Sequence, residues 1–573
     1  MRGRHRRSAE GGPSGGLSWW RSAVIYQVYP RSFADADGDG IGDLAGITSR
    51  LDYLVDLGVD GVWLSPFYVS PMLDFGYDVA DHGAVEPMFG TIADFDELLA
   101  AAHARGLRVL IDYVANHTSD QHPWFVDSRQ GRCSRRRDWY VWADPALDGG
   151  PPNNWLSTFP ACGSAWTRDQ TTGQYYLHSY TPNQPDLNWQ HSEVRQAMAE
   201  VLRFWLERGV DGFRVDAAHR LVKDPTLADN PVEVAALRTA LEPGAERLGH
   251  IDQPGVHAVL RELRAVVAEY GADKLLIGEV GVADPGRWAA YYGAADELDL
   301  PLNFAFWSAP FSADGLRHAV DTTRRVLPEG ACPLWALGNH DLPRLATRYD
   351  EGGRGAVRAR LAAMLLLCLP GSALVYYGEE IGMRNVSIPA VLARDPDGRD
   401  GCRTPMQWGA AANAGFCPAG VTPWLPIAST PDRVNVLDQD GREDSLLTLY
   451  RRLIALRRAE PALALGDYDT LASGPTVLAF RRAHAGRAVL VALNFADRSC
   501  EVKLPGTDRG RLLLRTDPGR SVELPAGRLV LAGSEGALIA VDDKTNRPGR
   551  ANHGRSEHPG NNSDQSGAPT ARE

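Results

Sequence analysis

The chain has 573 residues, which is too long for one compact core and indicates about three domains. Its formal net charge of −12 argues against a nucleic-acid-binding protein, because such proteins need a basic face to neutralise phosphates. Its seven cysteines include no CxxC pair, so we expect reduced thiols rather than a disulfide framework or a zinc site.

The N-terminal segment, residues 1–16, is basic and then rich in Gly and Ser, and we expect it to be a disordered tail. No apolar run of a secretory signal follows it, and the longest apolar run, 361–371, is too short to span a bilayer and predicts a buried helix. These features predict a cytoplasmic protein with no membrane partner. Residues 542–573 are rich in Asn, Gly, Ser, Pro and charge, and we expect a second disordered tail there.

From residue 24 onward the chain repeats one unit, made of a short apolar run, a polar loop and a longer helical pattern. Runs that are apolar throughout are typical of a parallel sheet whose two faces are both covered. Helical patterns such as 94–106 and 194–209 separate these runs. Eight such units predict a (β/α)8 barrel, or TIM barrel, formed by residues 17–117 and 190–463. The expected strands are 24–30, 59–66, 107–114, 210–217, 274–280, 298–306, 333–339 and 373–378.

The loop after the first strand, ADADGDGIGDLAG at 34–46, carries acidic residues at the spacing of an EF-hand calcium loop. Gly40 stands where that loop turns sharply, but Gly46 replaces the glutamate that an EF-hand needs at position 12. A phosphate-binding loop is disfavoured because the carboxylates would repel phosphate, so a metal loop and a polar turn remain open. The residues at the ligand positions are Asp35, Asp37, Asp39, Ile41 through its carbonyl, and Asp43.

Two further regions interrupt or follow the repeat. Residues 118–189 fill a gap far too long for a normal loop, and their Trp, Pro, Gly and Asn content indicates a subdomain inserted after the third strand. Residues 464–541 change to short alternating strands, such as 476–483 and 488–495, which predict a C-terminal antiparallel β-sandwich domain.

Polar residues end several of the expected strands, and in a (β/α)8 barrel these ends share the face where active sites lie. Charged groups there are costly to bury without partners, so their repetition favours a catalytic site. Two carboxylates with arginine and histidine donors suit glycoside hydrolysis, in which one carboxylate attacks and a protonated one acts as the acid. A metal site of His117, His340 and Asp341 is an alternative, although no HxH or HExxH spacing supports it. The strand-end residues are Asp112, for which we expect a structural role, and His117, Arg214, Asp216, Glu279, His340 and Asp341.

The segments DYVANH, GFRVDAAH, IGEV and NHD resemble, in this order, the four signature regions of the α-amylase family of glycoside hydrolases (family 13). GYDVADH, QPDLNW, GEEIGM and GRDGCRTPMQW are similar to its subgroup of α-glucosidases and oligo-1,6-glucosidases, and the resemblance covers residues 17–541. It implies a retaining enzyme that forms a covalent glucosyl intermediate. Asp216 would be the nucleophile, Glu279 the general acid/base and Asp341 the transition-state stabiliser.

The same resemblance implies a pocket closed around the terminal glucose of an oligosaccharide or α-glucoside, which would make the enzyme exo-acting. Arg399 would pair with Asp74 across this pocket, and Tyr77 would be the platform under the sugar ring. The other implied substrate-binding residues are His117, Arg214 and His340, with Phe159 and Tyr180 as candidates for an apolar wall.

The resemblance also places a structural calcium ion in the acidic loop, and magnesium is the less favoured ion. No organic cofactor is implied. The calcium ligands would be Asp35, Asp37, Asp39, the Ile41 carbonyl and Asp43.

The residue after the nucleophile is Ala217, where family members that favour α-1,6 linkages have valine. The space that alanine leaves predicts an α-1,4 preference, with maltose and maltooligosaccharides as substrates. The subgroup pattern is broken at His82, where a tyrosine is usual, and by the short linker between GEEIGM and GRDGCR. A transglucosylase, an oligo-1,6-glucosidase and a sucrose- or trehalose-acting relative are the close alternatives. A non-catalytic carbohydrate-binding protein or transporter partner is a distant one, because the catalytic carboxylates are present.

Overall fold

The computed structural model describes residues 18–239, 241–242, 244–395, 397–428, 434–471, 474–503, 510–519 and 528–542. The predicted N-terminal tail, 1–16, lies outside these ranges, as do residues 543–573 of the predicted C-terminal tail. Asp542 differs from the prediction, because it is the last residue of a β-strand. Within the described ranges, no helix is both long and apolar enough to cross a membrane.

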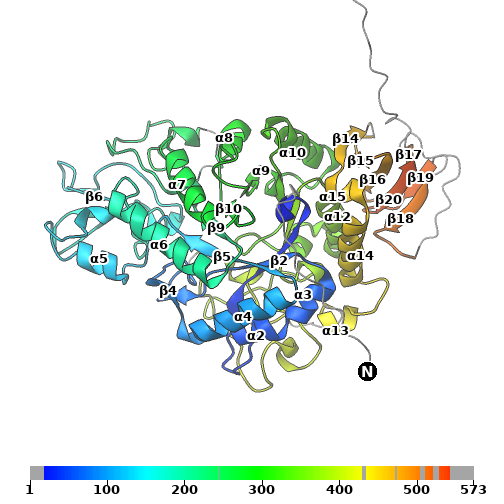
Figure 1. Ribbon diagram of the computed structural model, residues 1–573, viewed down its shortest axis with the longest axis horizontal. Helices are drawn as coiled ribbons and strands as arrows, with labels where there is room; N and C mark the ends of the chain where they lie inside the picture. Colours follow the sequence, from blue (N-terminus) through cyan, green and yellow to red (C-terminus); the bar gives the residue numbers. More distant parts are fainter. Residues whose placement is uncertain are drawn as a thin grey trace, which may run out of the picture.

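Eight parallel strands form the central sheet, and each corresponds to one of the eight predicted strands (Figure 1). A parallel bridge between Leu302 and Leu334 joins the two outermost strands of the sheet order and closes it into a barrel. The predicted TIM barrel is therefore confirmed. In order of neighbours, the strands are β11 (Leu300–Pro301), β10 (Leu275–Gly278), β9 (Gly212–Asp216), β5 (Arg108–Val114), β2 (Gly61–Leu64), β1 (Val24–Val28), β13 (Ser372–Tyr376) and β12 (Leu334–Ala336).

The barrel strands are apolar throughout because both of their faces are buried. Ile25, Trp63 and Leu110 belong to a cluster that fills the barrel, with side chains from seven of the eight strands. The adjacent residues Tyr26 and Val62 point the other way, into the larger cluster between the strands and the helices. Because side chains alternate along each strand, one set packs inside the barrel and the other packs between the barrel and the helices.

The helices that follow the strands lie around the barrel (Figure 1). The first long one begins at a capping box in which Thr91 and Asp94 exchange side-chain and backbone hydrogen bonds. The predicted helix 194–209 ends at Gly209, whose positive φ of 106° lets the chain turn back into β9. Residues 361–368 of the apolar run 361–371 are buried in a helix, as predicted, and the helix ends at Cys368. The long barrel helices are α4 (Ile92–Ala104), α6 (Ser192–Arg208), α7 (Val256–Ala268), α10 (Ala313–Val326), α12 (Gly355–Cys368) and α14 (Leu446–Ala459).

The sixth predicted strand, 298–306, is wrong in its second half. Strand β11 ends at Pro301, and the short helix α9 (Phe304–Trp307) follows. Pro301 lacks the backbone N–H that a longer strand would need, and the Asn303 side chain accepts the N–H of Phe306 and caps the helix instead. The apolar side chains of this segment therefore follow a helical rather than an extended path.

Between β5 and β9 the chain forms a separate antiparallel sheet, within the predicted insertion 118–189. Figure 1 shows this segment projecting at one side of the barrel, mostly in cyan. A bridge between His117 and Asp186 holds the two ends of the insertion together. The sheet order is β6 (Trp142–Ala143), β8 (Tyr175–Leu177) and β7 (Trp166–Arg168).

The C-terminal region is an antiparallel β-domain, as predicted, and its two sheets share one apolar core. Buried Arg482 fastens it to the barrel, donating 2.7 Å to the carbonyl of Cys368 at the end of α12. The larger sheet has the order β14 (Asp467–Leu471), β15 (Val477–His484), β16 (Arg487–Asn494), β20 (Gly536–Asp542) and β18 (Arg511–Arg515), and the smaller one pairs β17 (Cys500–Lys503) with β19 (Arg528–Leu531).

Candidate active site

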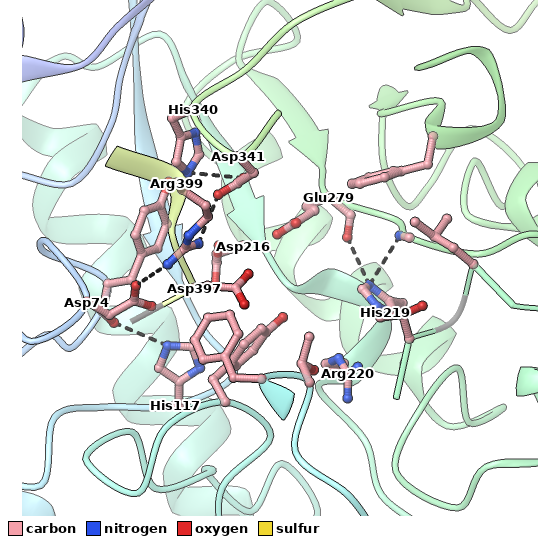
Figure 2. Close-up of a pocket in the computed structure, with 18 of the residues that line it drawn as sticks. Asp74, His117, Asp216, His219, Arg220, Glu279, His340, Asp341, Asp397 and Arg399 are labelled. Atoms are coloured by element: carbon pink, nitrogen blue, oxygen red, sulfur yellow. Dashed lines mark hydrogen bonds and ion pairs between the residues drawn. The ribbon is translucent and has the colours of Figure 1, made fainter. Parts of the chain in front are cut away.

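A pocket of about 220 Å³ lies at the C-terminal ends of the barrel strands, where barrels of this type hold their active sites. Its size suits a short substrate. Figure 2 shows the side chains of several strands and loops converging on it. The pocket is lined by all three predicted catalytic residues and all eight predicted substrate-binding residues, namely Asp216, Glu279, Asp341, Asp74, Tyr77, His117, Arg214, His340, Arg399, Phe159 and Tyr180.

Arg214 lies at the base of this pocket and binds three carboxylates. Its Nη1 is 2.6 Å from Asp112 Oδ1 and 2.5 Å from Asp216 Oδ1, and its Nη2 is 2.8 Å from Glu279 Oε2. The barrel register explains this, because β5 and β9 place Asp112 directly beside Arg214 and the strand period puts Asp216 on the same face. Asp112 also accepts a bond from Trp63 Nε1 and does not line the pocket, in agreement with its expected structural role.

One guanidinium cannot neutralise three carboxylates, so this cluster favours holding a proton. Burial raises the pKa of Asp112 to about 6, although Arg214 opposes the shift. Burial also raises the pKa of Asp216, with Glu279 and Asp112 adding to the effect and Arg214 opposing it. A retaining glycosidase needs one such proton, carried by the carboxyl group that acts as the acid while the nucleophile is ionised.

Asp341 has a contrasting environment, with two guanidinium groups and the His340 imidazole close to it. Arg399 Nη1 is 3.0 Å from its Oδ1, Arg403 Nη2 is 3.1 Å from the same oxygen, and His340 Nε2 is 3.3 Å from Oδ2. Burial alone would raise the pKa of Asp341, but these three groups outweigh it and hold the pKa below its usual range. This carboxylate is therefore ionised at neutral pH and suited to stabilising positive charge.

The aspartate–arginine ion pair expected across the pocket is present. Arg399 Nη2 is 2.8 Å from Asp74 Oδ1, and Gln184 donates 2.9 Å to the other oxygen of this aspartate. Gln184 also lies 3.2 Å from Nε2 of His117. Arg399 is fixed from behind by buried Asp395, 2.7 Å from its Nη2. This network closes one end of the pocket (Figure 2).

Two rings form the floor and side of the same end. Tyr77 stacks on His340 with centroids 5.3 Å apart and an interplanar angle of 6°. Nδ1 of His340 is 2.8 Å from the side-chain amide of Gln27, so the neutral ring carries its proton on Nε2, next to Asp341. Burial lowers the pKa of His340 to about 3, which keeps the ring neutral. A neutral Nε2–H is a donor for a sugar hydroxyl.

Phe159 and Tyr180 come from the inserted segment and pack edge to face, with ring centroids 5.7 Å apart. The Arg399 guanidinium lies 5.1 Å from the centroid of Phe159, and His117 is 5.3 Å from that of Tyr180. The insertion therefore supplies an aromatic wall on the side of Asp74.

The sequence predicted no role for the other lining residues. His219 and Arg220 stand within the strand end GFRVDAAHR, three and four positions after Asp216, so their place on the pocket follows from that of the nucleophile candidate. The rest lie on long connections without a motif. The eight additional residues are Thr158, His219, Arg220, Thr239, Leu241, Gly281, Phe304 and Asp397.

The acidic loop forms a compact turn away from this pocket. The carboxylates of Asp35, Asp37 and Asp39 each offer an oxygen within 4.8 Å of the others, a donor set that fits a hard cation such as calcium. Ile41 belongs to the same turn and donates its N–H to Asp39. Asp43 has another use, because its oxygens accept three backbone N–H groups, including that of Gly46 at the start of α2 (Leu44–Ser49). Within the described part of the chain, His117, His340 and Asp341 form no such ligand group.

Comparison with known proteins gives the family. Residues 27–466 match the family model described as alpha amylase, catalytic domain. A "Probable alpha-glucosidase" of Rhizobium meliloti (strain 1021) is 43% identical over 508 residues, which is 85% of this chain and 91% of that protein. An "Oligo-1,6-glucosidase" of Parageobacillus thermoglucosidasius is 36% identical, covering 85% of this chain and 92% of its own length.

Among solved structures, an "alpha-glucosyl transfer enzyme", XgtA, is 40% identical, with a TM-score of 0.85 over 92% of this chain and 100% of that one. The barrel fold and the carboxylates around Arg214 agree with the family that these relatives indicate. The chain belongs to the α-amylase family of glycoside hydrolases, in its subgroup of α-glucosidases and oligo-1,6-glucosidases.

Proposed function

We propose that the protein is a retaining, exo-acting α-glucosidase that releases glucose from the non-reducing end of short α-1,4-linked substrates. The observation that carries the proposal is the pairing of a closed pocket end, made by Asp74 and Arg399, with an Arg214-bound carboxylate cluster. A pocket closed at one end accepts a terminal residue rather than the middle of a chain.

In the proposed first step, the Asp216 carboxylate attacks the anomeric carbon of the terminal glucose. The bond from that carbon to the leaving oxygen breaks, and the carboxyl proton of Glu279 passes to this oxygen. Positive charge develops on the sugar ring, and the Asp341 carboxylate, held ionised by Arg399 and Arg403, stabilises it.

In the second step, Glu279 takes a proton from a water molecule, and the water oxygen attacks the same anomeric carbon. The bond to Asp216 breaks, and glucose leaves with the anomeric configuration of the substrate. The proton gained by Glu279 restores the starting state. Two inversions at one carbon are the reason for retention.

The experiment that tests this mechanism is hydrolysis of an aryl α-glucoside by wild type and by Asp216→Asn, with the product anomer followed by NMR. We expect the variant to lose about four orders of magnitude in kcat, and the first product of the wild type to be α-glucose. Asp314→Asn, an exposed aspartate on α10, is the matched control and should keep full activity. Activity in Asp216→Asn, or β-glucose as first product, would contradict the proposal.

The α-1,4 preference rests on Ala217, which is fully buried beside the two catalytic carboxyl groups. A methyl group fills less of this space than the valine found in members that favour α-1,6 linkages would. We expect a higher kcat/KM for maltose than for isomaltose, and Ala217→Val to reduce the ratio. Equal turnover of the two sugars by the wild type would refute this preference.

Transfer of glucose to a sugar or alcohol is the second candidate function, and it is favoured by the likeness to the "alpha-glucosyl transfer enzyme". An acceptor hydroxyl would replace water in the second step. Product analysis at high maltose concentration separates the two, because transfer gives trisaccharides whereas hydrolysis gives glucose alone.

We also propose that Asp35, Asp37 and Asp39, with the Ile41 carbonyl, hold a structural calcium ion. The converging carboxylates support this, because Asp39, Asp43 and Asp35 add to the effect of burial in raising the pKa of Asp37, and a cation would relieve that repulsion. Chelation should lower the Tm, and added calcium should restore it. Asp37→Asn should show a smaller response to the chelator, and an unchanged wild-type Tm would exclude the ion.

A further inference from the structure

The turn that follows β9 wraps around Glu279. Ala217 has a left-handed backbone, with φ 45° and ψ 37°, which is uncommon for a residue with a side chain and bends the chain sharply after Asp216. As a result the N–H of Ala217 donates 2.9 Å to Glu279 Oε2, and the N–H of Ala218 donates 3.1 Å to the backbone carbonyl of Glu279. The same turn thus contacts both the carboxylate and the main chain of Glu279.

His219 completes this arrangement. Its Nδ1 lies 3.2 Å from the backbone carbonyl oxygen of Glu279, and Figure 2 shows its ring beside that residue. The next contact of Nδ1, to the N–H of Gly281, is longer at 3.4 Å. The two contacts need opposite tautomers of the ring, and on the shorter distance we assign the proton to Nδ1, so that His219 donates to the Glu279 carbonyl.

His219 is itself firmly placed. Its backbone carbonyl accepts the N–H of Asp252 at 2.7 Å, and its side chain is largely buried in the wall of the pocket. Burial and the neighbouring Arg220 lower the pKa of His219 to about 3, so the ring adds no charge next to Glu279. His219 therefore acts on Glu279 through a directed hydrogen bond and not through the electric field of a charge.

The N–H of Glu279 is bonded to Val215 in the neighbouring strand, at 2.9 Å. The sheet therefore fixes one side of its peptide, and the turn 217–219 fixes the other. The Glu279 side chain, which is 19% exposed, can then aim only within the narrow range that its own torsions allow. A displacement of this backbone would move the carboxyl away from the leaving oxygen, and small displacements are costly in catalysis.

We propose that His219 is a positioning residue for Glu279: its hydrogen bond to the Glu279 carbonyl holds the acid/base carboxyl in line with the leaving-group oxygen. This inference rests on the proposed role of Glu279 as general acid/base. It predicts that loss of the bond harms the reactions that need protonation of the leaving group and spares those that do not.

The test compares substrates whose leaving groups differ in their need for an acid. A nitrophenyl α-glucoside has a good leaving group that departs with little protonation, whereas maltose needs it. His219→Phe keeps a ring but has no N–H, and His219→Asn restores a donor in a smaller side chain. We expect His219→Phe to lower kcat/KM for maltose about tenfold more than for the nitrophenyl glucoside, and His219→Asn to recover part of the difference.

Two further variants separate the explanations. His250→Ala removes a buried histidine that stacks on Trp155 and does not line the pocket, so it should lower the Tm without changing the ratio between substrates.

Glu279→Gln should show the same substrate dependence as His219→Phe, but more strongly. If Glu279→Gln lowers both activities equally, the proposed role of Glu279 is wrong. If Glu279→Gln discriminates and His219→Phe does not, the positioning role of His219 is overturned.

Discussion

The two ends of the pocket are built differently. At the closed end, the side chains of Asp74, Arg399 and Asp341 are joined by ion pairs of 2.8–3.0 Å, and each contacts a further partner. On the side of Glu279, the lining includes Leu241, from the long connection after β9, and Phe304, the first residue of α9. Figure 2 shows Asp74 and Arg399 on one side of Asp216, and Glu279 and His219 on the other. A fully paired end can hold one sugar in one way, whereas a loosely paired end can accept several leaving groups.

Charge supports this distinction. Arg399 is shared by Asp74, Asp341 and Asp395, so none of the four groups can leave without stranding another buried charge. We infer that recognition of the terminal glucose is set by buried electrostatics, and recognition of the rest of the substrate by shape.

Among the variants that probe the two ends of the pocket, Arg399→Lys has the largest expected effect. An ammonium group cannot reach three carboxylates with the planar fork of a guanidinium, so at least one of them loses its partner. We expect kcat/KM to fall about a hundredfold or more for maltose and for an aryl α-glucoside alike, measured by initial rates. Arg394→Lys, on an exposed part of the same loop, is the control and should be neutral. A fall in kcat/KM for only one of the two substrates would contradict the distinction between the two ends of the pocket.

The Arg214 cluster could be predicted from the sequence and the Asp74–Arg399 pair only from the family resemblance, whereas the open end could not be predicted. Arg214 and Asp216 alternate on one strand, so their shared face follows from the strand period alone. Leu241 lies on a connection whose path depends on tertiary contacts such as the bond from Trp155 Nε1 to the Ala228 carbonyl, and no local pattern encodes those. Where the structure differs from the other predictions, two local sequence patterns compete at one residue.

Asp43 illustrates that competition. Its spacing matches a metal ligand, but it also precedes a helix, and the N-cap bonds to backbone N–H groups occupy its oxygens. The sixth strand failed for a similar reason, because Asn303 caps a helix within an apolar run. Where one residue satisfies two patterns, periodicity does not decide between them.

His82 does not line the pocket, and its substitution is expected to have an effect of intermediate size, on stability rather than on catalysis. His82 is buried, its Nδ1 has no hydrogen-bond partner among the residues that the structure describes, and burial lowers its pKa to about 4. An unfolded histidine has a pKa of about 6.5, so between these values the unfolded state binds more protons and folding stability falls as the pH falls. The loss of folding free energy due to His82 approaches about 3 kcal/mol near pH 4.

His82→Tyr removes this titration, since a tyrosine stays neutral over that range. We expect the Tm to decrease less between pH 7 and pH 4.5 in the variant than in the wild type, as measured by thermal unfolding at each pH. The substrate ratio should not change, because His82 does not line the pocket. An identical pH dependence of Tm would show that other groups dominate, of which neighbouring His122, with a pKa of about 2, is the first candidate.

The smallest effect is expected at the open end, from Leu241→Ala. The Leu241 side chain is 39% exposed, so its removal costs little stability and takes apolar surface away from the leaving group alone. We expect KM for an aryl α-glucoside to rise about twofold to threefold with little change in kcat, because the contact is equal in the ground and transition states. Leu437→Ala, an exposed leucine on α13 (Val436–Gln439), is the matched control. If Leu241→Ala reduced kcat for maltose as strongly as Arg399→Lys, the open end would share the work of placing the glucose, and the distinction between buried electrostatics and shape would fail.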